Sequence, residues 1–70
     1  MQLIEALAHQ SPIPITVVKA GGIDSQIGRQ FRWCNGHIQT RVNEKKTWHR
    51  LINFPSWWLE YMEIDDNEIL

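Results

Sequence analysis

The sequence predicts a small α+β protein of one domain: an antiparallel sheet of three or four strands, with a short N-terminal helix and a C-terminal helix packed on it. Three observations lead to this prediction. The chain has 70 residues, which leaves room for one compact unit spanning residues 1–70. The dipeptide Asn35-Gly36 separates two β-like runs, which is typical of a two-residue hairpin turn. An apolar stripe at helical spacing then follows between residues 54 and 64.

The first half of the chain predicts one helix and one strand. Residues 2–9 place apolar side chains at helical spacing and indicate a short amphipathic helix. The prolines at positions 12 and 14 end it, because proline has no backbone N–H and disfavours helix in the residue before it. Residues 15–19 form a β-branched run that predicts a strand, and Pro14 at its start favours the edge of a sheet. Residues 23–28 are compatible with a loop or with one helical turn.

A chain reversal at Asn35-Gly36 fixes the partners and faces of the central hairpin. The predicted cross-strand pairs are Gln30 with Arg41, Phe31 with Thr40, Arg32 with Gln39, Trp33 with Ile38, and Cys34 with His37. Strand alternation assigns one face to the core, formed by Phe31, Trp33, Ile38, Thr40 and Val42. The opposite face is polar or basic and contains no carboxylate; it carries Gln30, Arg32, Cys34, His37, Gln39 and Arg41. The hairpin therefore predicts a basic outer surface.

The last third of the chain predicts a further strand, a helix and a tail. Residues 47–52 are rich in β-forming side chains and extend the sheet as a meander. Asn53 is a candidate N-cap ahead of Phe54-Pro55, since proline is accepted in the first helical turn. The stripe of Trp57, Trp58, Tyr61 and Met62 then predicts a helix that packs on the sheet. Residues 65–70 are expected to form an acidic, solvated tail.

The near-zero net charge of −1 conceals a marked asymmetry along the chain. Residues 26–50 carry six basic side chains and one acidic, whereas the last twenty carry five acidic and no basic side chains. One interpretation is that the two blocks neutralise each other across an ordinary solvated surface. The other is that the basic block forms a contact surface for phosphate groups or for an acidic partner.

Enzymatic, metal and cofactor chemistry find little support in the sequence. Cys34 and His37 face each other across the predicted turn, but no oxyanion site or pocket accompanies them. With His49 they supply at most three zinc ligands, whereas a structural zinc site normally has four. Gly21-Gly22 and Gly28 do not make a phosphate-binding loop. We therefore expect a protein that is not an enzyme and has no metal and no cofactor.

The abundance of Trp and Arg favours a small protein-binding module, for example a phage or mobile-element inhibitor or adaptor. The alternative is a DNA-binding protein that uses the basic outer face of the 29–42 hairpin, since a β-ribbon fits the major groove. A pI of 6.2 counts against the alternative. Trp57 and Trp58 diverge by about 100° on a helix, so either one of them is exposed to a partner or both pack around the edge of the sheet. The candidate binding residues are Arg32, Gln39, Arg41, Lys45, Lys46, Arg50, Trp57 and Trp58.

The sequence also carries expectations about location and assembly. A single cysteine, Cys34, suits a reducing compartment, and no uncharged apolar run approaches the ~20 residues of a membrane span. The N-terminus shows no signal-peptide pattern, so we expect a cytoplasmic protein with no membrane contact. Homodimerisation through a sheet edge at residues 15–19 would supply burial that a chain of this size lacks.

Overall fold

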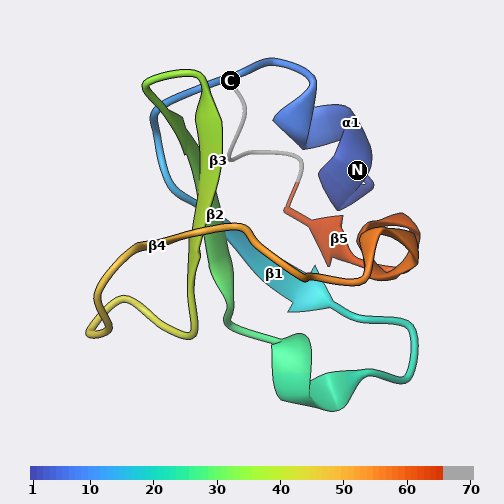
Figure 1. Cartoon of the computed structure of the whole chain (residues 1–70). Coiled ribbons are helices and arrows are strands. Elements are labelled where there is room, and N and C mark those ends of the chain that lie inside the picture. The colour runs from blue at the N-terminus through green and yellow to red at the C-terminus, as the bar shows by residue number, and fades with distance from the viewer. Residues whose placement is uncertain (66–70) are drawn as a thin grey trace.

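The computed structural model describes residues 1–65, which form a five-stranded antiparallel sheet with short helical segments (Figure 1). In chain order the elements are α1 (Leu3–Leu7), β1 (Ile15–Lys19), the 3-10 helix η1 (Asp24–Gln26), β2 (Gln30–Cys34), β3 (His37–Arg41), β4 (His49–Arg50), the 3-10 helix η2 (Ser56–Glu60) and β5 (Glu63–Ile64). The strand order is β4-β3-β2-β1-β5. The prediction of a small α+β domain with an antiparallel sheet is confirmed, with one strand more than expected.

The β2–β3 hairpin agrees with the sequence in every pair. Asn35 and Gly36 have φ angles of 52° and 80°, the positive values that a type I′ turn requires at both centres. The register runs from Gln30 opposite Arg41 to Cys34 opposite His37, as predicted. Phe31 and Thr40 are consequently buried on one face of the hairpin, and Trp33 and Ile38 pack against the core from the same face.

The core lies between the sheet and the segments α1 and η2. Its fully buried side chains are Phe31, Leu3, Met62 and Val17. The Trp33 indole donates a 2.6 Å hydrogen bond from Nε1 to the carbonyl of Leu7. The Leu7 carbonyl also accepts the Gln10 N–H over 3.1 Å, so the indole adds a second bond at the end of α1 and ties α1 to β2.

The predicted C-terminal helix is wrong. Five residues, Ser56–Glu60, form a 3-10 helix, and the chain then extends into β5, which pairs with β1. Two physical reasons explain the difference. Short isolated helices rich in aromatic residues are marginal, and the side of β1 that faces away from β2 needs hydrogen-bonding partners. Ile64 is therefore buried in a strand.

Three further expectations about strands and caps need correction. The predicted strand over residues 47–52 is reduced to His49–Arg50, although the Leu51 N–H still donates to the Ile38 carbonyl over 2.9 Å. Val42 lies beyond β3 and is 53% exposed instead of facing the core. Asn53 does not cap a helix: it has a φ of 56°, and η2 begins after Pro55.

β1 is an interior strand, so the expected sheet edge at residues 15–19 is also wrong. β2 pairs with Ile15 and Thr16, and β5 pairs with Val17 and Lys19 on the other side. Residues 23–28 contain the single turn η1. The predicted acidic tail falls, apart from Asp65, outside the described residues.

The first and last described segments meet at β5. The Leu3 N–H donates to the Met62 carbonyl, and the Ile64 N–H donates to the Met1 carbonyl, each over 2.8 Å. β5 thus lies between β1 and the N-terminal segment, where its backbone has partners on both sides. Within residues 1–65, no helix has the length and apolar character needed to cross a bilayer.

Candidate functional site

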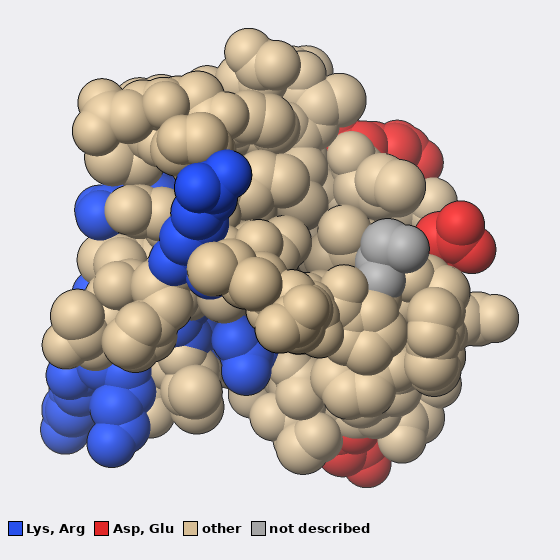
Figure 2. Space-filling model, viewed as in Figure 1, with Lys and Arg blue, Asp and Glu red and all other residues tan. Residues whose placement is uncertain are grey.

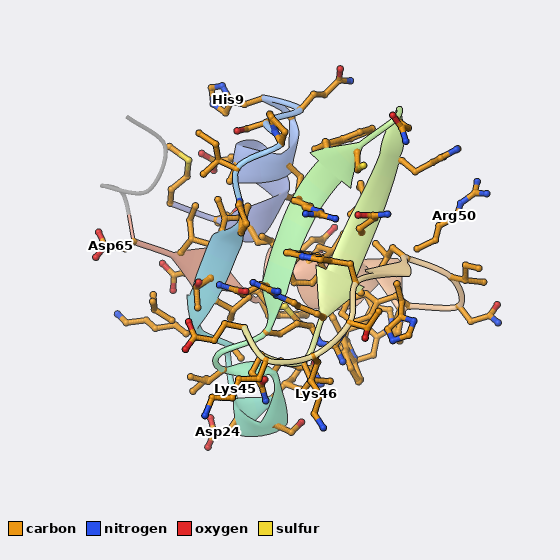
Figure 3. The ribbon with its side chains drawn as sticks, turned by 90° about the vertical axis from the view of Figure 1, so that its left-hand side faces the viewer. His9, Asp24, Lys45, Lys46, Arg50 and Asp65 are labelled. Carbon is orange, nitrogen blue, oxygen red and sulfur yellow. The ribbon has the colours of Figure 1, made fainter. Side chains whose placement is uncertain are left out.

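Basic and acidic side chains occupy different sides of the molecule. In Figure 2 lysine and arginine gather on the left, over β3, β4 and the segment joining them, whereas the acidic side chains lie on the right and at the lower edge. Figure 3 places Arg50 and Asp65 at opposite sides of the sheet, in agreement with the strand order. Within residues 1–65, the basic side chains of β4 and of the segment before it therefore lie apart from Asp65.

The outer face of the hairpin carries a stacked cluster of two arginines and one tryptophan. The guanidinium carbons of Arg32 and Arg41 lie 4.3 and 4.4 Å from the centroid of the Trp48 ring. Arg32 Nε donates a 2.8 Å bond to Gln39 Oε1, and Arg41 Nε donates a 2.7 Å bond to Gln30 Oε1. These five residues form the arginine–tryptophan cluster, whose positions are fixed by planar stacking and by charge-assisted hydrogen bonds.

The arginine–tryptophan cluster limits which groups of the predicted basic face are available to a binding partner. Arg32, Gln39 and Arg41 share one face, as the hairpin register implies, but Trp48 covers part of it. The amide oxygens of Gln30 and Gln39 each already accept one bond within the chain, which leaves a reduced capacity for base edges. Within residues 1–65, the hydrogen-bond and stacking partners described for these two guanidinium groups are uncharged, namely Gln39, Gln30 and Trp48.

Lys45, Lys46 and Arg50 lie at the periphery of this face and are exposed. The lysines belong to a turn in which the Lys45 N–H donates to Asn43 Oδ1 over 2.9 Å. Arg50 pairs with Gln39 in the sheet, which directs it to the same face as Arg32 and Arg41. The described structure thus brings together six of the eight predicted binding residues, all but Trp57 and Trp58.

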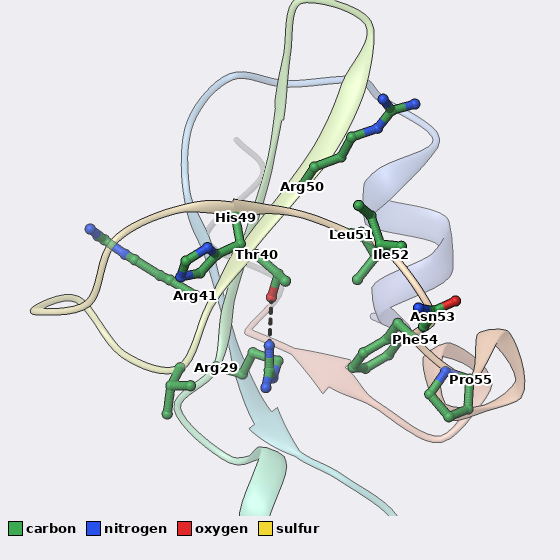
Figure 4. Close-up of a pocket in the computed structure, with 11 residues that line it drawn as sticks. Arg29, Thr40, Arg41, His49, Arg50, Leu51, Ile52, Asn53, Phe54 and Pro55 are labelled. Atoms are coloured by element: carbon green, nitrogen blue, oxygen red, sulfur yellow. Dashed lines mark hydrogen bonds between the residues drawn. The ribbon is translucent and has the colours of Figure 1, made fainter.

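A groove of about 300 Å³ opens between the inner side of β3–β4 and the segment that follows (Figure 4). Arg29 lies within it, half-buried, and its Nη1 donates a 3.1 Å bond to Thr40 Oγ1. Its Nε donates a 2.6 Å bond to Gln26 Oε1, and its guanidinium carbon lies 5.6 Å from the Phe54 centroid. Burial lowers the pKa of Arg29, because desolvation disfavours the charged form. We name this feature the Arg29 groove.

A second surface is aromatic. Trp57 is 56% exposed and Tyr61 52% exposed, and their ring centroids are 6.1 Å apart. We call these two residues the aromatic patch. Trp58 is half-buried, and its indole N–H has no hydrogen-bond partner in the described part of the chain. Trp57 is therefore more accessible to a partner than Trp58.

Sequence reasoning missed Trp48, Arg29 and Tyr61 as site residues. Trp48 was assigned to a regular strand, and no local pattern reveals that its ring turns back over two arginines. Arg29 stands just before the hairpin, and its position in a groove depends on Phe54, which is distant in sequence. Tyr61 was expected to belong to the apolar face of a helix.

Comparison of the chain with families of known proteins, with curated proteins and with solved structures finds no match. Among residues 1–65, no group of three or more His, Cys, Asp or Glu side chains is placed to hold a metal ion.

Proposed function

We propose that this chain is a small non-enzymatic binding protein that docks on another protein through the aromatic patch. The observation that carries the proposal is the exposure of two adjacent large aromatic side chains, Trp57 and Tyr61. Tryptophan and tyrosine are enriched among the interface residues that contribute most to binding. Exposing both without a partner leaves a large apolar area in water.

The rigidity of the patch supports the same proposal. Edge-to-face ring contacts join Phe31 to Phe54 at 5.9 Å, Phe54 to Trp58 at 5.4 Å, and Trp58 to Trp57 at 5.7 Å. The exposed rings are thus connected to the fully buried Phe31. A side chain held in place before binding loses less conformational entropy when a partner covers it.

The test is capture of the partner by the immobilised full chain, from a lysate of the organism that encodes it. At salt high enough to screen phosphate contacts, we expect one stoichiometric protein, lost with Trp57→Ala. The matched control is Ile13→Ala, which removes a 65% exposed apolar side chain elsewhere on the surface and should leave capture unchanged. Circular dichroism of both variants checks that they fold. Equal capture by the wild type and by Trp57→Ala would contradict the proposal.

A second candidate is nucleic-acid binding through the basic face, favoured by the separation of charge in Figure 2. Because β5 lies at the edge of the sheet opposite β4, the acidic residues Glu63 and Asp65 are remote from Lys45 and Lys46. Their repulsion of a phosphate backbone is correspondingly small. The use of both glutamine oxygens within the chain favours phosphate contacts over base readout.

A mobility-shift series in salt tests this second candidate. If nucleic acid binds, the double variant Lys45→Ala with Lys46→Ala should weaken binding and lower the slope of log affinity against log salt by about two units. The control is Lys19→Ala on β1, away from the basic face, which should not alter the slope. Absence of a shift with any duplex or single strand at low salt would eliminate this candidate.

A further inference from the structure

We propose that the Arg29 groove binds a carboxylate carried on an apolar group of the docked protein partner. This inference rests on the proposed function for the source of the ligand, but the groove and its charge stand on their own observations. The groove joins a positive floor to apolar walls, and each of these two features selects a different part of the ligand.

The floor of the groove is a half-buried cation with uncharged partners. The Arg29 guanidinium bonds to Thr40 and Gln26 and lies over Phe54, and none of these carries a compensating charge. Burying an ion costs free energy unless an opposite charge or strong hydrogen bonds accompany it, and the lowered pKa of Arg29 reflects that cost. An incoming carboxylate supplies the missing charge and can accept two parallel N–H bonds from one guanidinium.

The number of cations in the groove favours a monoanion. Arg41 and Arg50 also line the groove, but Figure 4 shows their side chains directed away from Arg29. The guanidinium of Arg41 lies over Trp48 on the outer face instead. Arg29 is thus the arginine whose guanidinium lies inside the groove, and the ring of His49 also lines it. One positive charge balances one carboxylate, whereas a phosphate dianion would keep an uncompensated charge.

The walls favour a ligand with an apolar body. Leu51, Ile52, Phe54, Pro55 and Val42 supply apolar side chains to the lining, with Asn53 as a polar neighbour. A volume of about 300 Å³ is at the lower end of the range for small-molecule sites. The groove therefore fits one carboxylate with one neighbouring apolar side chain, such as an acidic residue beside an aliphatic one or the terminal carboxylate of a chain that ends in an apolar residue.

The first experiment titrates the full chain with phenylacetate and follows NMR signals of Arg29 Nε–H and of the Leu51 methyl groups. We expect saturable shifts with phenylacetate, binding at least tenfold weaker for the uncharged phenylacetamide, and no tighter binding for phenyl phosphate. Arg29→Gln should weaken phenylacetate binding at least tenfold. Equal binding of the acid and the amide, or tighter binding of phenyl phosphate, would overturn the inference.

A second variant covers the case in which Arg29→Gln does not fold. Val42 is exposed at the rim, so Val42→Glu should place a carboxylate near Arg29 and weaken phenylacetate binding at least tenfold without unfolding the chain. Val42→Gln is the uncharged control and should bind as the wild type does. Wild-type affinity in Val42→Glu would contradict the inference.

The two proposals fail in different ways. Trp57→Ala should release the protein partner but leave phenylacetate binding intact, because Trp57 does not line the groove. Val42→Glu should weaken capture of the partner as well as the probe. Loss of probe binding together with unchanged partner capture overturns the groove as a partner site and leaves docking through the aromatic patch standing. Probe binding without any captured partner supports the groove chemistry and counts against the docking proposal.

Discussion

Gly21 is the residue whose substitution the structure constrains most sharply. It has a φ of +53°, and a Cβ built on it would lie 2.9 Å from Tyr61 Cβ and 3.1 Å from the Tyr61 carbonyl oxygen. The loop after β1 therefore approaches the backbone of Tyr61 so closely that no side chain fits between them. This contact positions one half of the aromatic patch.

We predict that Gly21→Ala destabilises the fold by about 2–4 kcal/mol, since it combines a left-handed backbone conformation with overpacking. Gly36→Ala is the matched control: its φ is +80°, but no atom lies within 4 Å of the added Cβ. That variant should cost about 1–2 kcal/mol. Urea unfolding of both variants measures the difference. Equal losses would show that the contact with Tyr61 relaxes freely.

At the scale of elements, the hairpin was predictable because its turn type and register depend only on residues close together in the sequence. The dipeptide Asn35-Gly36 determines the turn type, the turn determines the register, and the register determines which of Phe31 and Arg32 is buried. None of these steps needs a residue outside positions 30–41. The core face and the basic face of the hairpin therefore follow from the sequence alone.

The C-terminal elements were not predictable in this way because they depend on partners distant in sequence. The spacing of Trp57, Trp58 and Tyr61 is equally compatible with a helix and with a 3-10 turn that precedes a strand. What decides between them is the pairing of β5 with β1, some forty-five residues earlier, in which Ile64 lies opposite Val17 and Glu63 opposite Lys19. A local pattern does not contain that requirement.

Trp48 links the β3–β4 connection to the hairpin, and its removal should affect both. We predict that Trp48→Leu, which keeps an apolar cover but removes the π face, destabilises the fold by about 1–2 kcal/mol. Trp48→Phe keeps a π face and should lose less than half as much. Thermal or urea unfolding gives the comparison. Identical losses for Leu and Phe would mean that Trp48 acts only through apolar contact and not through Arg32 and Arg41.

At the scale of the whole molecule, the strand order of the sheet determines how far the first and last described residues lie from the basic face. Met1 and Leu3 bond to the segment containing β5, at the edge opposite β4. The basic face therefore lies far from both described ends, as Figures 1 and 2 show together. Composition alone revealed two blocks of opposite charge, and the strand order adds that β5, which carries Glu63, lies at the edge of the sheet opposite β4.

The part of the candidate site that lies on the hairpin was predictable, because the register of the hairpin depends only on nearby residues. Arg32, Gln39 and Arg41 belong to the hairpin, so their common face follows from its register. The Arg29 groove requires β3, β4 and Phe54 to come together, and the aromatic patch requires η2 to end at Glu60. Both depend on tertiary packing, which neither periodicity nor composition encodes.

The ring contact between Trp57 and Trp58 has a spectroscopic consequence. Two indoles whose centroids lie 5.7 Å apart couple their electronic transitions, and in a fixed chiral arrangement this coupling produces paired circular-dichroism bands of opposite sign. Because one indole is solvent-facing and the other half-buried, the same signal responds to capture of a partner at the surface and to loosening of the interior. Circular dichroism of the unlabelled protein can therefore follow both partner binding and loosening of the core.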